Sequence, residues 1–157
     1  MAYKVFISHS TSDIGLVTTL AHSLQKLEIE VFVADWYLSP GESLEKKIVD
    51  QIKSSNCVIV LLTRNGIRSN WVHQEIGCSL QSGLPIIPLV EHGIGSGELA
   101  ALQGREHIEF NPYQPQLSLD KLSRYVKELK LKKEEQEKAM LVAGGILLFL
   151  LLAEGKK

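Results

Sequence analysis

Short apolar runs alternate along the chain with segments whose apolar residues recur every three or four positions. The runs lie at residues 3–8, 29–34, 56–63, 85–90 and 105–110, and their β-branched and aromatic residues predict five β-strands. The run at 56–63 has no charge, which is typical of a central strand in a parallel sheet covered on both faces. Two prolines in the run at 85–90 predict a strand in which the hydrogen-bond ladder on one side is relaxed, because proline has no backbone N–H to donate.

The segments between the strands predict amphipathic helices. Their inward stripes are Leu16, Leu20, Leu24 and Leu27; Leu44, Ile48 and Ile52; Val72, Ile76 and Leu80; and Leu119, Leu122, Val126 and Leu129. Ser12 or Asp13 is expected to cap the first helix, and Ser69 or Asn70 the third. Between the last two strands, only residues 98–102 suit a helical turn. The alternation predicts an α/β fold, a flavodoxin-like open parallel five-stranded sheet in the order 2-1-3-4-5 with helices on both faces.

Length, charge and cysteine content narrow the classes of function. The 157 residues suit one core, and 45% hydrophobic with 22% charged residues is ordinary for a folded domain. The formal net charge of -1 provides no broad positive surface, so no nucleic-acid partner is expected. Cys57 and Cys78 lie far apart without a CxxC pair, so we expect neither a structural zinc nor a disulfide. The start shows no signal peptide, and a cytoplasmic domain is expected.

The apolar residues are spread unevenly, which the mean hydropathy of +0.04 conceals. Residues 139–153 (AMLVAGGILLFLLLA) carry no charge and follow a charge-rich segment. As a helix they would span ~22 Å of a hydrocarbon core of ~30 Å, and Lys138, Lys156 and Lys157 could snorkel to make up part of the difference. We therefore expect a domain at 1–131, a charged linker at 132–138 and a membrane-anchoring helix at 139–153. Burial of this helix against the domain or in an oligomer is the alternative.

The predicted topology selects a crevice beyond the carboxyl ends of the strands, where the strand order reverses. Residues 8–13, 35–43 and 64–75 border it. Trp71 and Glu75, four positions apart, share one helical stripe beside the core stripe. The pair suits cleavage of an N-glycosidic bond, because a ring can stack on the leaving base and a carboxylate can stabilise an oxocarbenium-like ribose. The alternative is a solvated surface glutamate and a packing tryptophan.

Three other kinds of site are excluded by the residues present. A phosphoryl-accepting aspartate at the end of the third strand is missing, since Thr63 stands there. The Gly-rich stretch at 93–97 (GIGSG) matches neither phosphate-binding pattern and is expected to be a flexible loop. Ser8 and His9 are neighbours on a strand and point to opposite faces, so they predict no nucleophile and base pair.

Three stretches resemble, in order, the sequence boxes of Toll/interleukin-1 receptor (TIR) domains. VFISHSTSD at 5–13 resembles the first box, and residues 35–55, with the Leu-Ser-Pro-Gly turn, resemble the second box with its BB loop. SNWVHQEIG at 69–77 is similar to the SxWCxxE stretch that carries the catalytic glutamate of NAD-cleaving members, with Val72 in place of the cysteine. The resemblance covers residues 4–131.

This resemblance implies a TIR fold with Glu75 as the catalytic carboxylate and Trp71 on the nicotinamide side of the substrate. It also implies that substrate contacts come from the end of the first strand and from the BB loop, namely Ser8, His9, Ser10, Asp35 and Trp36. NAD+ is then a substrate, and neither a cofactor nor a metal is required.

The chain resembles stand-alone microbial TIR proteins such as the TIR subunit of Thoeris antiphage defence. The resemblance implies an NAD+ hydrolase or cyclase that releases ADP-ribose or a cyclic isomer, works when self-associated and signals to a downstream effector in antiphage immunity. The product stays open. One alternative is a non-catalytic TIR module that signals by homotypic assembly. Another is a nucleoside deoxyribosyltransferase-like enzyme, which also uses a glutamate in a flavodoxin-like fold.

Overall fold

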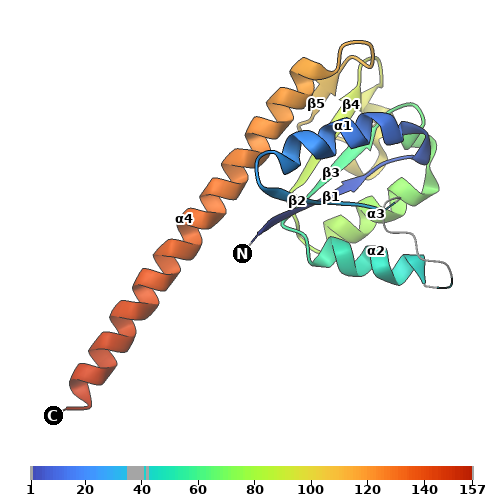
Figure 1. Ribbon diagram of the computed structural model, residues 1–157. Helices are drawn as coiled ribbons and strands as arrows, with labels where there is room; N and C mark the ends of the chain where they lie inside the picture. Colours follow the sequence, from blue (N-terminus) through green and yellow to red (C-terminus); the bar gives the residue numbers. More distant parts are fainter. Residues whose placement is uncertain (1, 35–40, 42, 157) are drawn as a thin grey trace. The chain divides into compact units, whose positions relative to one another are not determined.

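The computed structural model describes residues 2–34, 41 and 43–156, which form two compact units, Met1–Ser123 and Arg124–Lys157. Figure 1 shows strands alternating with helices in the first unit, as the apolar pattern predicts. The elements are β1 (Tyr3–Ser8), η1 (Thr11–Asp13), α1 (Ile14–Gln25), β2 (Ile29–Val33), α2 (Leu44–Lys53), β3 (Cys57–Leu62), η3 (Gly66–Arg68), α3 (Asn70–Gln81), β4 (Ile86–Glu91), η4 (Ser96–Leu102), β5 (Ile108–Phe110) and α4 (Gln116–Glu154).

The five strands form one parallel sheet in the order β2-β1-β3-β4-β5, which confirms the predicted topology. β3 lies in the middle, and all six of its residues are buried. Right-handed crossovers place α2, α3 and η4 on the same face of such a sheet, because their connections all run in one direction along it. The core on this face contains Phe6 and Val58 from the sheet, Ile48 from α2 and Ile76 from α3.

β4 and β5 show how Pro88 is accommodated, and Pro85 lies just before β4. β5 begins at Ile108, later than the predicted 105, because the chain is still turning at Gly104, whose φ is +81°. Ile108 lies opposite Leu89, so the pairing with β5 starts one residue after Pro88. Pro88 therefore pairs only with β3, where it lies opposite Val60. The prediction that one side of this strand lacks a pairing partner at a proline is thus confirmed at Pro88, on the side that faces β5.

The helices begin and end close to the predicted positions. Residues 11–13 form η1, capped by Ser10, so α1 starts at Ile14. Leu20 and Leu24 are buried as expected, whereas Leu27 lies beyond the end of α1. The α3 cap is Ser69, whose side chain accepts a hydrogen bond from the backbone nitrogen of Val72. Gly83, with a φ of +68°, follows α3, as expected for a glycine that ends a helix.

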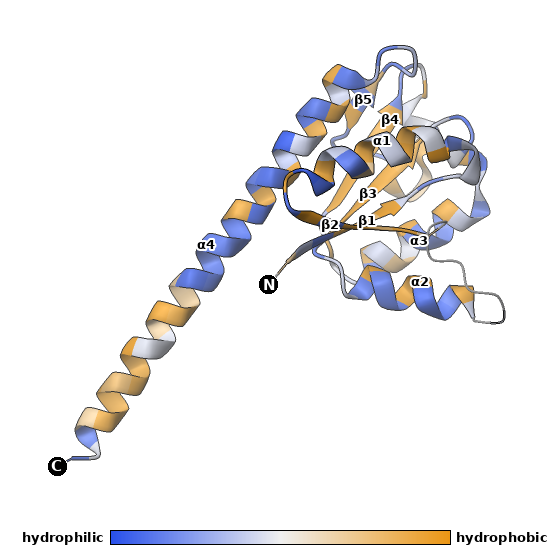
Figure 2. Cartoon of the chain, in the orientation of Figure 1, coloured by the Kyte–Doolittle hydropathy of each residue, from blue (hydrophilic) through white to orange (hydrophobic). Residues whose placement is uncertain are grey.

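α4 is one continuous helix of 39 residues. Its first turns belong to the first unit, where Leu119 and Leu122 are buried. Residues 132–138, expected as a linker, are helical. Figure 2 shows a hydrophilic stretch of α4 followed by a hydrophobic one that occupies most of the remaining helix. The helix is long and apolar enough to cross a membrane, with a mean hydropathy of 1.7 over its most apolar window and none of that window buried.

Candidate active site

Glu75 is a buried carboxylate, with 4% of its surface exposed, on the face of α3 that packs against the sheet. The Ser8 hydroxyl, at the carboxyl end of β1, donates a hydrogen bond to Glu75 Oε2. Successive strand residues alternate between faces, so Ser8 shares its face with Phe6 of the α2 and α3 core. The strand register therefore brings the Ser8 side chain to α3. Ser79 donates a hydrogen bond of 2.7 Å to the backbone oxygen of Glu75.

Two cavities are lined in common by Trp71, Glu75 and Ile48. The larger cavity, of about 730 Å³, runs between α2 and α3 and is lined by Glu45, Ile48, Val49, Ile52, Lys53, Trp71, Gln74, Glu75, Cys78, Gln81 and Ser82. The smaller one, of about 230 Å³, is lined by His9, Thr11, Ala34, Leu44, Ile48, Trp71 and Glu75. The smaller cavity is mainly apolar and lies at the carboxyl ends of β1 and β2, whereas the larger one is more polar. Glu75 and Trp71 line both cavities. A ligand larger than one ring could occupy both.

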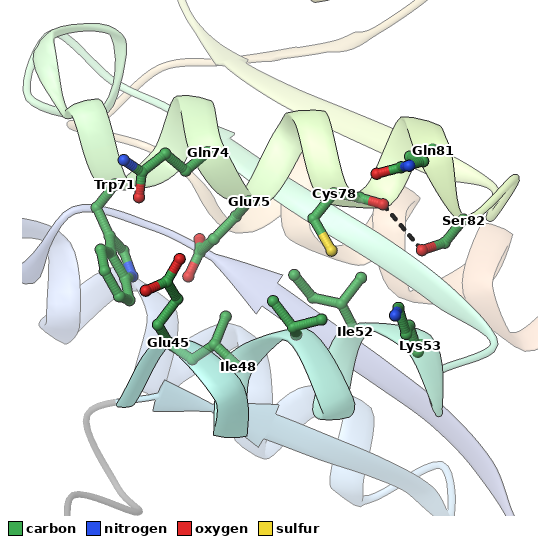
Figure 3. A pocket seen from close by; sticks show the side chains of 11 residues that line it. Glu45, Ile48, Ile52, Lys53, Trp71, Gln74, Glu75, Cys78, Gln81 and Ser82 are labelled. Carbon is green, nitrogen blue, oxygen red and sulfur yellow. Dashed lines mark hydrogen bonds between the residues drawn. The ribbon is translucent and has the colours of Figure 1, made fainter. Parts of the chain in front are cut away.

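Figure 3 shows the side chains on either side of the larger cavity. Glu75 projects from α3 toward α2, and Glu45 projects from the first turn of α2 toward α3, with the Trp71 indole beside them. Farther along, the Cys78 sulfur points to the same groove above Ile52. The arrangement places carboxylates and an aromatic face at one end of the groove, and Lys53 lines the other end.

The other residues expected to contact the substrate are placed differently. His9 is buried, lines the smaller cavity and has its Nδ1 3.2 Å from the Ile7 carbonyl oxygen. The Ser10 hydroxyl accepts a 3.4 Å hydrogen bond from the Ser12 backbone nitrogen, and neither Ser10 nor Ser8 is among the residues that line the two cavities. Asp35 and Trp36 lie outside the described residues.

A hydrogen-bond network holds together the loops that border the site. The Thr63 hydroxyl, just after β3, donates to Asp13 Oδ2 at 2.6 Å and accepts from the Gly66 backbone nitrogen at 2.9 Å. Asn65 Nδ2 donates to Asp13 Oδ1 at 3.4 Å. Thr63 thus joins the loop after β1 to the turn that leads into α3. Thr63 therefore has a structural role at the position where a phosphoryl-accepting aspartate would stand.

The groove between α2 and α3 was not foreseen from the sequence, and neither was Glu45. A signal exists in the helical spacing. Glu45, Val49 and Lys53 form a stripe one position after the core stripe of α2, and Trp71, Glu75, Cys78 and Ser82 form a facing stripe on α3. Right-handed crossovers put α2 and α3 side by side on one face of the sheet. The two stripes could therefore have been predicted to face each other across a groove.

The chemistry available at this site is that of an oriented carboxylate beside an aromatic ring. A carboxylate in a mostly buried position interacts strongly with positive charge that develops next to it. Among the described residues, no group of three or more His, Cys, Asp or Glu could hold a metal ion. The residues suit a reaction in which a cationic sugar centre forms against Glu75 while a planar group leaves against Trp71.

Comparison with known proteins identifies the fold family. A family model described as TIR domain matches residues 5–123. The NAD(+) hydrolase PdTIR of Paracoccus denitrificans is 32% identical over 103 residues, which is 63% of this chain and 34% of that protein. The 2' cyclic ADP-D-ribose synthase AbTIR of Acinetobacter baumannii is 33% identical over 75 residues, 47% of this chain and 28% of that protein. The chain thus matches about a third of the length of these relatives or less.

Solved structures agree on the fold. The TIR domain of the Toll-related receptor TRR-2 of Hydra magnipapillata has a TM-score of 0.62 at 22% identity, covering 85% of this chain and 98% of that one. The TIR domains of the activated Roq1 resistosome have a TM-score of 0.55 at 23% identity, covering 66% of this chain and 65% of that one. The family match over most of the chain, together with the sheet order, leads to one conclusion: the chain belongs to the TIR domain family.

Proposed function

We propose that this protein cleaves the bond between nicotinamide and ribose in NAD+, with Glu75 as the catalytic carboxylate. The observation that carries the proposal is the burial of Glu75 where two cavities meet beside Trp71. Burial of an ionised carboxylate has a large desolvation cost, which lowers the stability of the fold. A buried glutamate at this position is therefore better explained by a role in function than by a role in stability. The activities of two relatives, an NAD(+) hydrolase and a 2' cyclic ADP-D-ribose synthase, support the same chemistry.

The reaction needs no external electrons. The electron pair of the C1'–N bond moves onto the pyridinium nitrogen, so nicotinamide leaves as a neutral ring and the ribose becomes oxocarbenium-like. Glu75 stabilises that positive charge, and Trp71 offers a face for the departing ring. Water then forms a new bond to C1' and releases one proton to solvent, giving ADP-ribose. When a hydroxyl of the same molecule attacks C1' instead, it releases its proton to solvent in the same way and gives a cyclic isomer.

The test follows nicotinamide release from NAD+ by the purified full chain and by Glu75→Gln. We expect Glu75→Gln to lose nearly all activity, because the amide keeps the shape of the side chain and removes its charge. Glu30→Gln is the matched control, since Glu30 is an exposed carboxylate in β2. It should remain as active as the parent.

The same assay separates the alternatives. Absence of release from concentrated, assembled protein would contradict the proposal and favour the non-catalytic module that signals by homotypic assembly. Preference for deoxynucleosides over NAD+ would instead identify a deoxyribosyltransferase-like enzyme. Mass spectrometry of the NAD+ product distinguishes ADP-ribose from its cyclic isomers.

We further propose that the product acts as a signal in antiphage immunity and that a downstream effector senses it. The support is the resemblance to small microbial TIR proteins of defence systems and the cyclic ADP-ribose synthases among the relatives. Cells that carry the parent gene and its genomic neighbours should resist phage, and the Glu75→Gln version should not. Equal resistance in both would contradict a role for the product.

We also propose that residues 139–153 anchor the chain in a lipid bilayer. The large apolar side chains between Met140 and Leu152 are 54–76% exposed, and apolar residues or glycines occupy every side of this helical stretch. A second copy packed against one side would leave the other side in water, whereas a bilayer surrounds the helix completely. The test is flotation with phospholipid vesicles: the full chain should float, and a chain ending at Lys138 should stay in the soluble fraction. A full chain that forms soluble oligomers and does not float would contradict the anchor.

A further inference from the structure

The hydroxyl of Ser8 is bonded directly to the carboxylate on which the proposed reaction depends. Ser8 has none of its surface exposed and donates to Glu75 Oε2. A fully buried hydroxyl cannot hydrogen-bond bulk water, so this contact satisfies its donor within the protein. The bond also gives a buried carboxylate a partner that favours its charged form. Ser8 is not among the residues that line the two cavities beside Glu75.

Both partners of this bond stand on rigid elements. Ser8 ends β1 and lies opposite Val60 of β3, in the interior of the sheet. Glu75 lies in the middle of α3, whose start is fixed by the Ser69 cap and whose Glu75 carbonyl is bonded by Ser79. A donor fixed in a sheet and an acceptor fixed in a helix leave the carboxylate plane little freedom. The hydrogen bond from Ser8 fixes the position of Glu75 Oε2, and the planar carboxylate then fixes the direction of Glu75 Oε1.

We propose that Ser8 is a positioning residue that orients the Glu75 carboxylate and keeps it charged, and that it acts through Glu75 and not on the substrate. This inference rests on the proposed NAD+ cleavage for its kinetic consequences, whereas the hydrogen bond can be tested without it. It gives the end of β1 a different task from the substrate contact that the resemblance implies for Ser8.

The kinetic experiment compares four proteins in NAD+ cleavage: the parent, Ser8→Ala, Ser8→Cys and Ser8→Thr. We expect Ser8→Ala to lower kcat by about tenfold with little change in KM, because the loss falls on the carboxylate in the transition state. Ser8→Cys keeps the size of the side chain but is a weak donor, so it should behave like Ser8→Ala. Ser8→Thr keeps the hydroxyl and should restore most of kcat.

The pH profile supplies a readout that a merely structural serine would not move. Loss of a donor that favours the charged carboxylate should shift the acidic limb of kcat to higher pH in Ser8→Ala. Ser79→Ala is the matched control, since Ser79 is equally buried and bonds the Glu75 backbone in place of the carboxylate. It should leave the acidic limb where it is in the parent.

A measurement without substrate keeps this proposal separate from the proposed function. In protein labelled with ¹³C at glutamate carboxyl groups, the NMR titration midpoint of Glu75, assigned with Glu75→Gln, should rise in Ser8→Ala and stay unchanged in Ser79→Ala. An unchanged midpoint in a folded Ser8→Ala protein would overturn the role of Ser8, whatever the activity. Inactivity of the parent toward NAD+ together with a raised midpoint would overturn only the proposed function.

Discussion

Trp71 lines both cavities beside Glu75, so its indole is placed to stack on the nicotinamide that leaves in the proposed reaction. Stacking of a base on an aromatic side chain contributes ~1–3 kcal/mol, which corresponds to a loss of about fivefold to 150-fold in kcat/KM for Trp71→Ala. Trp71→Phe retains a face and should stay within a few fold of the parent. Steady-state nicotinamide release measures both variants, and a Trp71→Ala enzyme with unchanged kcat/KM would exclude the stacking role.

Cys57 is the residue whose ionisation couples most clearly to folding. Burial at the start of β3 raises the pKa of its thiol from 9.0 to about 12, against an opposing hydrogen bond with Tyr3. Below about pH 9 the thiol is protonated in both states, and between about pH 9 and 12 only the unfolded chain loses the proton. The free energy of unfolding should therefore fall as pH rises through that range, by up to ~1.4 kcal/mol per pH unit.

Urea denaturation between about pH 8 and 10 tests this coupling. Cys57→Ala removes the thiol, so its stability should fall less steeply above about pH 9 than that of the parent. Other titrating groups contribute equally to both proteins. Parallel pH dependences would show that the buried thiol does not control alkaline stability.

The sequence identified Glu75 and Trp71 as a pair but placed both beside the core. The structure buries Glu75 and leaves Trp71 partly exposed. Helical spacing alone could not predict this burial, because it depends on Ser8, which lies 67 positions away in sequence. A polar residue at the end of a buried strand and a glutamate on a helix become partners only once the strand order fixes which face each meets.

At the level of elements, the turn at η3 sets the position of α3, and close backbone packing at Gly66 fixes the conformation of this turn. A Cβ added at Gly66 would lie 2.5 Å from the backbone oxygen of Leu61, and the Gly66 nitrogen bonds the Thr63 hydroxyl. We expect Gly66→Ala to lower the free energy of unfolding by about 1–3 kcal/mol and to reduce NAD+ cleavage, because η3 leads directly into the helix that carries Glu75.

Gly77→Ala provides the opposite case on the same stretch of chain. Gly77 is exposed within α3, and a Cβ there would meet nothing within 4 Å. Alanine in a helix interior is favoured over glycine, so this variant should be more stable by about 0.5–1 kcal/mol. Thermal denaturation of both variants checks the pair, and equal effects of the two substitutions would show that the backbone contact at Gly66 carries no weight.

Elements marked by strong local patterns were predicted well, and those shaped by distant contacts were not. The apolar run at 56–63 correctly gave the central strand, and the Ser69 cap and Gly83 end of α3 follow from local backbone chemistry. The late start of β5 follows a local turn at Gly104, which the apolar run at 105–110 does not mark. The groove between α2 and α3 depends on how two helices pack, and no single stretch of sequence encodes it.

At the scale of the whole molecule, the proposed site and the proposed anchor have a joint consequence. The resemblance to NAD-cleaving TIR domains implies that the site works when copies assemble, so specific activity should rise with protein concentration. An anchor at residues 139–153 would confine the chains to a surface and raise their effective concentration without adding a new contact. Membranes would then promote activity through the tail although the tail takes no part in chemistry.

The prediction is that phospholipid vesicles lower the concentration of full chain needed for half-maximal specific activity by about tenfold or more. A chain ending at Lys138 should show the same activity at high concentration and no response to vesicles. Glu75→Gln on vesicles should stay inactive, which excludes lipid-induced hydrolysis. If vesicles activate the truncated chain equally, the lipid acts on the domain and the tail is not the cause. If the full chain binds vesicles but its specific activity does not depend on concentration, the single chain already contains the complete site.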